Sequence, residues 1–112
     1  MELTVVAKLV VDDKNADTEA FLQRHVAKKL EKLEQRLGKP LVVRVTLEEG
    51  TADFDACVTV HGTPDIVGKE REPVMLKAVD GAIDKVTRQF EAASEKKTGR
   101  ERGRGTVKVG EL

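Results

Sequence analysis

Residues 22–48 of the chain read LQRHVAKKLEKLEQRLGKPLVVRVTLE, and the change of pattern within them decides the fold. The first part spaces five large apolar residues by four, four, three and four positions: Leu22, Val26, Leu30, Leu33 and Leu37. This spacing places them on one side of an amphipathic α-helix of about five turns. Asp17 or Thr18 is the predicted N-cap, because either side chain can accept a hydrogen bond from a first-turn N–H. Gly38 can adopt the left-handed conformation that ends a helix and Pro40 cannot continue one, so we expect the helix to stop there.

The rest of this stretch has the pattern of a strand. Residues 41–48 alternate between apolar and polar side chains, which predicts a half-buried β-strand. Alternation recurs in two further runs, residues 3–11 and 54–61, and residues 66–71 are predicted to form a shorter, weaker strand. Turn residues such as Gly50 and Pro64 separate the last three predicted strands, so we expect these strands to form a meander.

A second helix follows the fourth predicted strand. Pro73 suits a first helical turn, where its missing N–H is not needed. Five apolar residues then recur at helical spacing: Leu76, Val79, Ile83, Val86 and Phe90. The order of elements is therefore β-α-β-β-β-α, and we predict the α+β class, with a four-stranded mixed sheet and two helices packed on one of its faces. The first two strands should be parallel through a right-handed crossover. This topology is similar to that of double-stranded RNA-binding domains.

The length of 112 residues predicts one small domain, which we assign to residues 1–94. Residues 95–112 are rich in Lys, Arg, Gly, Glu and Thr, and their sizeable apolar residues are Val107, Val109 and Leu112. Burial of so few apolar side chains cannot offset the entropy lost on ordering the segment. We therefore predict that residues 95–112 form a disordered basic tail.

Composition narrows the classes of function. The chain has no Trp or Tyr and three Phe, which argues against a large aromatic-lined pocket and against the base-stacking platform of single-strand binders. A single cysteine cannot form an internal disulfide or a cysteine-based zinc site. The N-terminus lacks a basic start followed by an apolar stretch, and no apolar run approaches the roughly 20 residues that span a bilayer. We expect a cytoplasmic protein that is not inserted in a membrane.

Few residues offer catalytic or metal chemistry. Cys57 and His61 are the obvious nucleophile and base, but four residues of strand separate them by about 13 Å, well beyond the ~3 Å that such a pair requires. Asp80 and Asp84 share a helix face without a predicted pocket, which favours a solvated pair. His25 has no second ligand at metal-binding spacing. We therefore expect no enzymatic activity, no metal, no cofactor and no small-molecule substrate.

The charges of the chain are unevenly distributed although its net charge is zero. Residues 19–40 contain six basic and three acidic residues, whereas residues 41–66 contain one and five. The predicted helices carry two basic stripes: Arg24, Lys28, Lys29, Lys32 and Arg36 on the first, and Lys85 and Arg88 on the second. Two helices on the same sheet face should bring these stripes together into a cationic ridge or groove. Such a surface suits RNA phosphates, although a solvated helix face partly neutralised by Glu31 and Glu34 fits the same pattern.

Three segments of the predicted helices point to a known family: HVAKKLEKLE (residues 25–34), MLKAVD (residues 75–80) and IDKVTRQF (residues 83–90). They resemble the helix signatures of the ribosome hibernation-promoting factor and ribosome-associated inhibitor A family, whose members are also called sigma-54 modulation proteins. The segments occur in the order and at the separation of that family's β-α-β-β-β-α domain. The resemblance extends over most of residues 1–94.

The resemblance implies a stress or stationary-phase factor that docks on the small ribosomal subunit. Family members occupy the channel for messenger RNA and transfer RNA, contact ribosomal RNA through basic residues of both helices and block translation. By position, the resemblance implies four main RNA contacts: Lys29, Lys32, Lys85 and Arg88. The charge stripe adds Arg24, Lys28 and Arg36 as secondary candidates. The implied partners are the small ribosomal subunit and its RNA, and we expect a monomer away from the ribosome.

Other readings of the sequence stay open. Long members of the family carry an additional domain through which ribosomes dimerise, and 112 residues leave no room for it, so we expect the short form and leave its effect on dimerisation undecided. A small protein-binding regulator is one alternative, in which an acidic sheet face containing Glu48, Asp53 and Asp55 meets a basic protein. A general double-stranded RNA-binding module is another.

Overall fold

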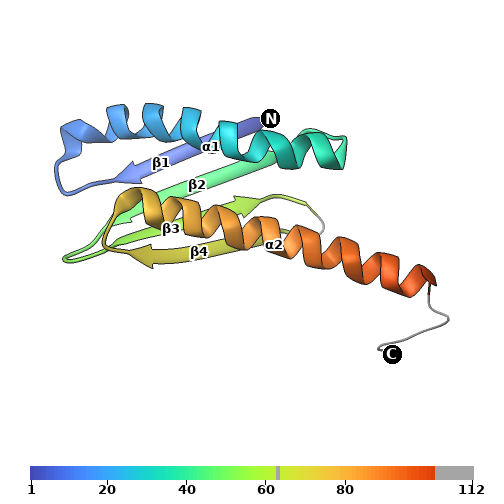
Figure 1. Cartoon of the computed structure of the whole chain (residues 1–112). Coiled ribbons are helices and arrows are strands. Elements are labelled where there is room, and N and C mark those ends of the chain that lie inside the picture. The colour runs from blue at the N-terminus through green and yellow to red at the C-terminus, as the bar shows by residue number, and fades with distance from the viewer. Residues whose placement is uncertain (63, 103–112) are drawn as a thin grey trace.

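The protein is a two-layer structure of one sheet and two long helices. A computed structural model describes residues 1–62 and 64–102, and the side chains of these residues except residues 12 and 93–102. Its elements are β1 (Glu2–Lys8), the 3-10 turn η1 (Asp12–Lys14), α1 (Asn15–Leu37), β2 (Val42–Glu49), β3 (Phe54–Val60), β4 (Ile66–Glu72) and α2 (Met75–Arg102). Both helices cover the same face of the sheet (Figure 1). The predicted α+β class and order of elements are confirmed.

The sheet has the strand order β1-β2-β3-β4. β1 is parallel to β2, with Val5 opposite Val45. The other two pairs are antiparallel, with Val58 of β3 opposite both Val45 and Gly68. A parallel pair needs a long crossover, which α1 supplies, whereas short turns suffice for the antiparallel pairs. The predicted parallel start and the meander are therefore both confirmed.

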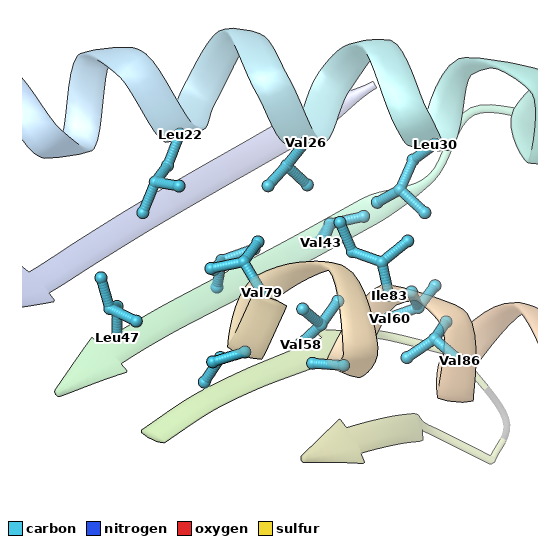
Figure 2. Packing of buried hydrophobic residues seen from close by; sticks show 14 of the residues in the cluster. Leu22, Val26, Leu30, Val43, Leu47, Val58, Val60, Val79, Ile83 and Val86 are labelled. Carbon is cyan, nitrogen blue, oxygen red and sulfur yellow. The ribbon is translucent and has the colours of Figure 1, made fainter. Parts of the chain in front are cut away.

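The apolar core lies between the sheet and the two helices (Figure 2). The predicted apolar side of α1 is buried at four positions: Leu22, Val26, Leu30 and Leu33. Leu37, the last residue of α1, is instead 37% exposed. α2 buries small and branched side chains: Ala78, Val79, Ala82, Ile83 and Val86. Alternate residues of β2 and β3, such as Val43 and Val58, complete the core from below.

α2 approaches β4 closely because glycine occupies two contact positions. A Cβ atom on Gly68 would lie 2.3 Å from the carbonyl oxygen of Ala82, and one on Gly81 would lie 2.7 Å from Cγ of Glu70. Glycine inside a helix costs about 1 kcal/mol relative to alanine. At Gly81 the missing side chain leaves room for the Glu70 side chain to lie beside the helix.

Side chains of the helices bond to the backbone at both edges of the sheet. Four hydrogen bonds of 2.7–2.9 Å do so: Glu19 with Ala7, Gln23 with Leu3, Lys85 with Lys69, and Gln89 with Val67. Unpaired edge groups are the positions at which a foreign strand can add to a sheet. The helices therefore protect the sheet that they cover.

β1 ends at Lys8, earlier than the predicted end at Val11, and Val10 and Val11 are 73% and 53% exposed. The N–H of Leu9 donates to Oδ1 of Asn15 (3.0 Å), and the N–H of Val10 donates to Oε1 of Glu49 (3.0 Å). Side-chain acceptors thus take the place of a neighbouring strand. An alternation pattern contains no information about such acceptors, so the predicted strand was too long.

The start of α1 also differs from the prediction, whereas its end agrees. The helix begins at Asn15, so the predicted N-caps Asp17 and Thr18 were wrong and both lie inside the helix. The turn η1 leads directly into α1, and Lys14, at the cap position, makes no side-chain cap bond. At the other end, Gly38 has φ 70° and donates its N–H to the carbonyl oxygen of Glu34 (3.0 Å), as its left-handed preference predicts.

α2 begins at Met75, so Pro73 precedes the helix instead of occupying its first turn. The N–H of Ala78 donates to the carbonyl oxygen of Val74, which makes Val74 the flanking residue. At its other end α2 continues to Arg102, past the predicted domain boundary at residue 94. Residues 91–98 include Glu, Ala and Lys, which favour helix. Residues 103–112 of the predicted tail lie outside the described residues, and the division between domain and disordered tail stays a prediction.

Candidate nucleic-acid interface

The two helices run parallel, and the same sequence offset relates the residues that contact each other at two levels. His25 of α1 contacts Asp80 of α2, and Arg36 contacts Glu91, and both pairs join residues that are 55 positions apart. An unchanged offset means that the two helices advance in the same direction, as the ribbons in Figure 1 also show. The offset therefore identifies which residues of α1 and α2 lie at the same level.

Carboxylates of α2 partner the side of α1 that faces them. Nε2 of His25 lies 2.7 Å from Oδ1 of Asp80, and Nζ of Lys29 lies 3.7 Å from the same oxygen. Further along, Nη1 of Arg36 lies 3.2 Å from Oε2 of Glu91. The Lys29 and Arg36 side chains are still 44% and 61% exposed. Two of the predicted RNA contacts are therefore ion-paired but reachable from solvent.

Three other predicted contacts form an exposed row on α1. Arg24, Lys28 and Lys32 are four residues apart, a spacing that places them one above another on the helix surface. All three are exposed, and none has an ion pair with the side chains described in residues 1–11, 13–62 and 64–92. This row is the part of the predicted stripe that offers unneutralised positive charge.

Lys85 lies on a different side of α2 from the one that meets α1. Its Nζ donates to the carbonyl oxygen of Lys69 (2.7 Å) and lies 2.7 Å from Oε1 of Glu70, both on β4. The hydrogen bond from Lys85 lowers the pKa of Glu70 below its ordinary value. Arg88, one turn later, is exposed and has no ion pair among the side chains that the structure describes.

The ion pairs put carboxylates between the helices, and the prediction that the two stripes meet in a cationic ridge or groove stays a prediction. Between the helices, Asp80 and Glu91 face the α1 cations, and Lys85 contacts β4. Helical spacing shows which residues share a face, but it does not show which residue of another element lies opposite. The role of the seven basic residues as RNA contacts is not decided by this arrangement and stays a prediction.

Sequence reasoning overlooked Phe21 as part of this surface. Its ring stacks on the His25 ring, with centroids 5.9 Å apart and an interplanar angle of 13°. Phe21 is 41% exposed, whereas the next residue, Leu22, is fully buried. The sequence did contain a signal for this site. Phe21 is a large aromatic residue that lies beside the apolar seam, one turn before Arg24 and His25.

The uncovered face of the sheet carries the polar alternates, but its charges are mixed. Nε of Arg71 lies 2.7 Å from Oδ1 of Asp55, and this hydrogen bond raises the pKa of Arg71. Lys8 is the register partner of Glu48. Cations and carboxylates, such as Lys69 and Glu48, both line an open cavity of about 630 Å³ at this end of the sheet. Two of the three carboxylates behind the acidic-face hypothesis therefore have a cation beside them.

Cys57 and His61, the nucleophile and base considered above, have different neighbours in the structure. Sγ of Cys57 lies 3.9 Å from Oγ1 of Thr59, and Nδ1 of His61 lies 3.7 Å from Oδ2 of Asp65. In the described part of the chain, no three His, Cys, Asp or Glu residues are grouped so that they could hold a metal ion. None of the helices described there has the length and apolar character needed to cross a membrane. The expected absence of a cofactor and of a small-molecule substrate stays a prediction.

One family model matches the chain, over residues 9–98, and its description is sigma 54 modulation protein / S30EA ribosomal protein. The chain belongs to this family. The match includes all of α1, α2 as far as residue 98 and all seven basic residues predicted to contact RNA, and it confirms the resemblance seen in the helix segments. Members of the family are ribosome-associated modulation and hibernation factors and are not known as enzymes, which gives this chain its general role. No curated protein matches the chain.

Proposed function

We propose that the chain binds ribosomal RNA of the small subunit in the channel used by messenger RNA and transfer RNA, and that it blocks translation sterically under stress. The observation that carries this proposal is the exposed row of Arg24, Lys28 and Lys32 on α1, in a chain of a ribosome-associated family. Arg88 adds an exposed cation on α2. The protein would act as a monomer in the cytoplasm and without enzymatic activity.

The row suits a nucleic-acid backbone for electrostatic reasons. Its members recur about every 6 Å along α1, since each residue of a helix rises about 1.5 Å. A line of cations binds phosphates with release of counterions, so affinity falls steadily as salt rises. Recognition of this kind depends on charge and shape and needs no reading of base edges.

The ion-paired cations contribute by exchanging partners. An exposed ion pair stabilises a protein by no more than about 1 kcal/mol, so RNA phosphates can displace Asp80 from Lys29 and Glu91 from Arg36. Lys85 has two partners on β4, at 2.7 Å each, and both contacts must be broken. We therefore rank Lys85 below the exposed row.

Co-sedimentation with vacant small subunits across a salt series tests the RNA contacts. The triple variant Lys28→Ala, Lys32→Ala, Arg88→Ala should bind at least about tenfold more weakly and with a shallower salt dependence. The control Lys8→Ala, Arg44→Ala, Lys69→Ala removes the same number of exposed cations from the uncovered sheet face. The control should bind as the wild type does, and equal losses in both variants would contradict the assignment.

Competition tests the proposed location. Small subunits that already hold messenger RNA and transfer RNA should not bind the protein, because the channel is occupied. Unchanged binding to these filled subunits would place the protein elsewhere on the ribosome. Tight binding to plain RNA duplexes in the absence of ribosomes would instead favour a general double-stranded RNA-binding module.

A further inference from the structure

Phe21 is an aromatic side chain among the exposed cations of α1. Arg24 and Lys28 follow it by three and seven residues, so all three share one side of the helix. Asp17, one turn before Phe21, is acidic and exposed, so Phe21 stands at the beginning of the cationic row. An aromatic ring next to a row of positive charge combines the two features that bind a nucleic-acid strand.

The Phe21 ring is held in a defined position. One of its faces stacks on His25, with centroids 5.9 Å apart. His25 is in turn fixed by its 2.7 Å contact with Asp80, and its side chain is only 23% exposed. The stack is thus anchored where α1 meets α2, and a ligand that uses the exposed part of the ring loses little side-chain entropy.

We propose that Phe21 is a stacking site for an unpaired nucleobase of an RNA strand whose neighbouring phosphates contact Arg24 and Lys28. A single exposed hydrophobic residue needs no explanation by itself. The flanking cations decide the occupant, because they complement a phosphate backbone and not an apolar protein segment. Bases inside a duplex are already stacked, so the base must come from a loop, a bulge or a strand end.

This site deepens the proposed function, on which it depends only for the identity of the RNA as ribosomal. The composition argues against a multi-residue platform of the kind that binds long single strands. One ring can still hold one base, and the phosphate contacts then extend from Phe21 along the row toward Lys32. The strand would thereby gain a fixed starting point on α1.

The absence of Trp and Tyr from the sequence allows a direct optical test. The variant Phe21→Trp carries one indole, whose fluorescence falls when a base stacks on it. We expect saturable quenching by a single-stranded oligoribonucleotide and much less by a blunt duplex of the same length. The control Val42→Trp places the indole on the uncovered sheet face, at a residue of similar exposure (43% against 41% for Phe21). Equal responses of the two variants, or binding without quenching, would overturn the stacking site.

Ribosome binding supplies the second measurement. Phe21→Leu keeps an apolar side chain but removes the aromatic ring, and it should weaken binding to the small subunit roughly tenfold. Phe21→Tyr should bind within about twofold of the wild type, because the ring is retained. Thermal unfolding of both variants shows whether the fold is intact, and the fluorescence test stands if Phe21→Leu is unstable.

The two proposals fail in different ways. If the wild type binds the small subunit and a folded Phe21→Leu variant binds equally well, the stacking site is wrong and the ribosomal role stands. If the wild type does not bind the small subunit while single-stranded RNA quenches Phe21→Trp, the ribosomal role is wrong and the stacking site stands.

Discussion

The two long helices cover the same sheet face in parallel, yet different residues dock them. α1 inserts large side chains such as Leu22 and Leu30 into the core, whereas α2 buries Ala78 and Ala82 and approaches β4 at Gly68. Because α2 lies close to β4, its Lys85 contacts that strand. The cationic row of α1 remains exposed. Packing of a helix therefore influences which of its charges a partner can reach.

The strongest test of this difference is Gly68→Ala. The added Cβ would lie 2.3 Å from the carbonyl oxygen of Ala82, so α2 must move away from β4. We expect the free energy of unfolding to fall by about 2 kcal/mol or more, measured by urea denaturation.

Gly81→Ala is the matched control for Gly68→Ala. Its new Cβ would meet Cγ of Glu70 at 2.7 Å, but the Glu70 side chain can move and alanine favours helix. We expect a change within about 1 kcal/mol. Equal losses at the two positions would show that the Glu70 side chain cannot move aside, so that both glycines are needed for the close approach of α2 to β4.

Single alanine substitutions compare the cations of the two helices. Lys32→Ala should weaken binding to the small subunit several-fold and reduce the slope of log affinity against log salt by about 0.7–0.9. Lys85→Ala should have a smaller effect, because Lys85 must leave Glu70 and Lys69 before it can bind a phosphate. Co-sedimentation at three or more salt concentrations measures both values. A larger loss from Lys85→Ala would make α2 the dominant contact.

Asp80→Asn and Asp84→Asn each remove one negative charge from α2. Asp80 contacts His25 and Lys29, whereas Asp84 is exposed and makes no ion pair among the described side chains. Removal of the Asp80 charge releases Lys29, so Asp80→Asn should tighten ribosome binding by a few-fold more than Asp84→Asn does. Equal gains would show that only long-range charge matters, and a loss with Asp80→Asn would show that Asp80 positions its partners.

The smallest expected effect concerns pH. The pKa of Glu34 is lowered chiefly by the hydrogen bond from the Leu41 N–H (2.9 Å), and that of Glu70 chiefly by the hydrogen bond from Lys85. A carboxyl group whose pKa is lowered on folding stabilises the fold above its ordinary pKa of 4.5 and loses that contribution as pH falls through the lowered value. Glu34→Gln and Glu70→Gln should therefore each make stability less dependent on pH below about 4.5.

The contributions of Glu34 and Glu70 to stability should respond differently to salt. The contribution of Glu70 should shrink at high salt, because its main partner is an ammonium group at the surface. The contribution of Glu34 should persist more strongly, because its main partner is a backbone N–H. Urea midpoints between about pH 6 and pH 3 at two salt concentrations check both expectations. The same salt response at both residues would contradict this distinction.

Sequence periodicity was informative where a single buried face controls the choice of residues. The spacing of Leu22, Val26 and Leu30 predicted both the helix and its buried side. Gly38 predicted the end of α1, because its left-handed conformation is a local property. The end of β1 was missed, since Leu9 and Val10 donate to side chains of Asn15 and Glu49 that no periodicity encodes. The start of α1 was missed because the turn η1 leads directly into the helix without a side-chain cap bond.

The candidate interface shows the same limit. Spacing alone predicted the row of Arg24, Lys28 and Lys32, because residues four apart share a helix face. It could not predict that Lys29 meets Asp80, which is contributed by the other helix. It also missed the position of the Phe21 ring, which is held by stacking on His25, itself in contact with Asp80.

The order of amino acids was thus sufficient for the α+β class, the sequence of elements, the buried side of each helix and the family, because all of these follow from patterns along the chain. The assignment of charges to partners arose only when both helices had docked on the sheet. Lys29 then came within 3.7 Å of Asp80, and Lys85 within 2.7 Å of Glu70. Ion pairing depends on distance through space, and that distance is set by packing between elements that are far apart in sequence.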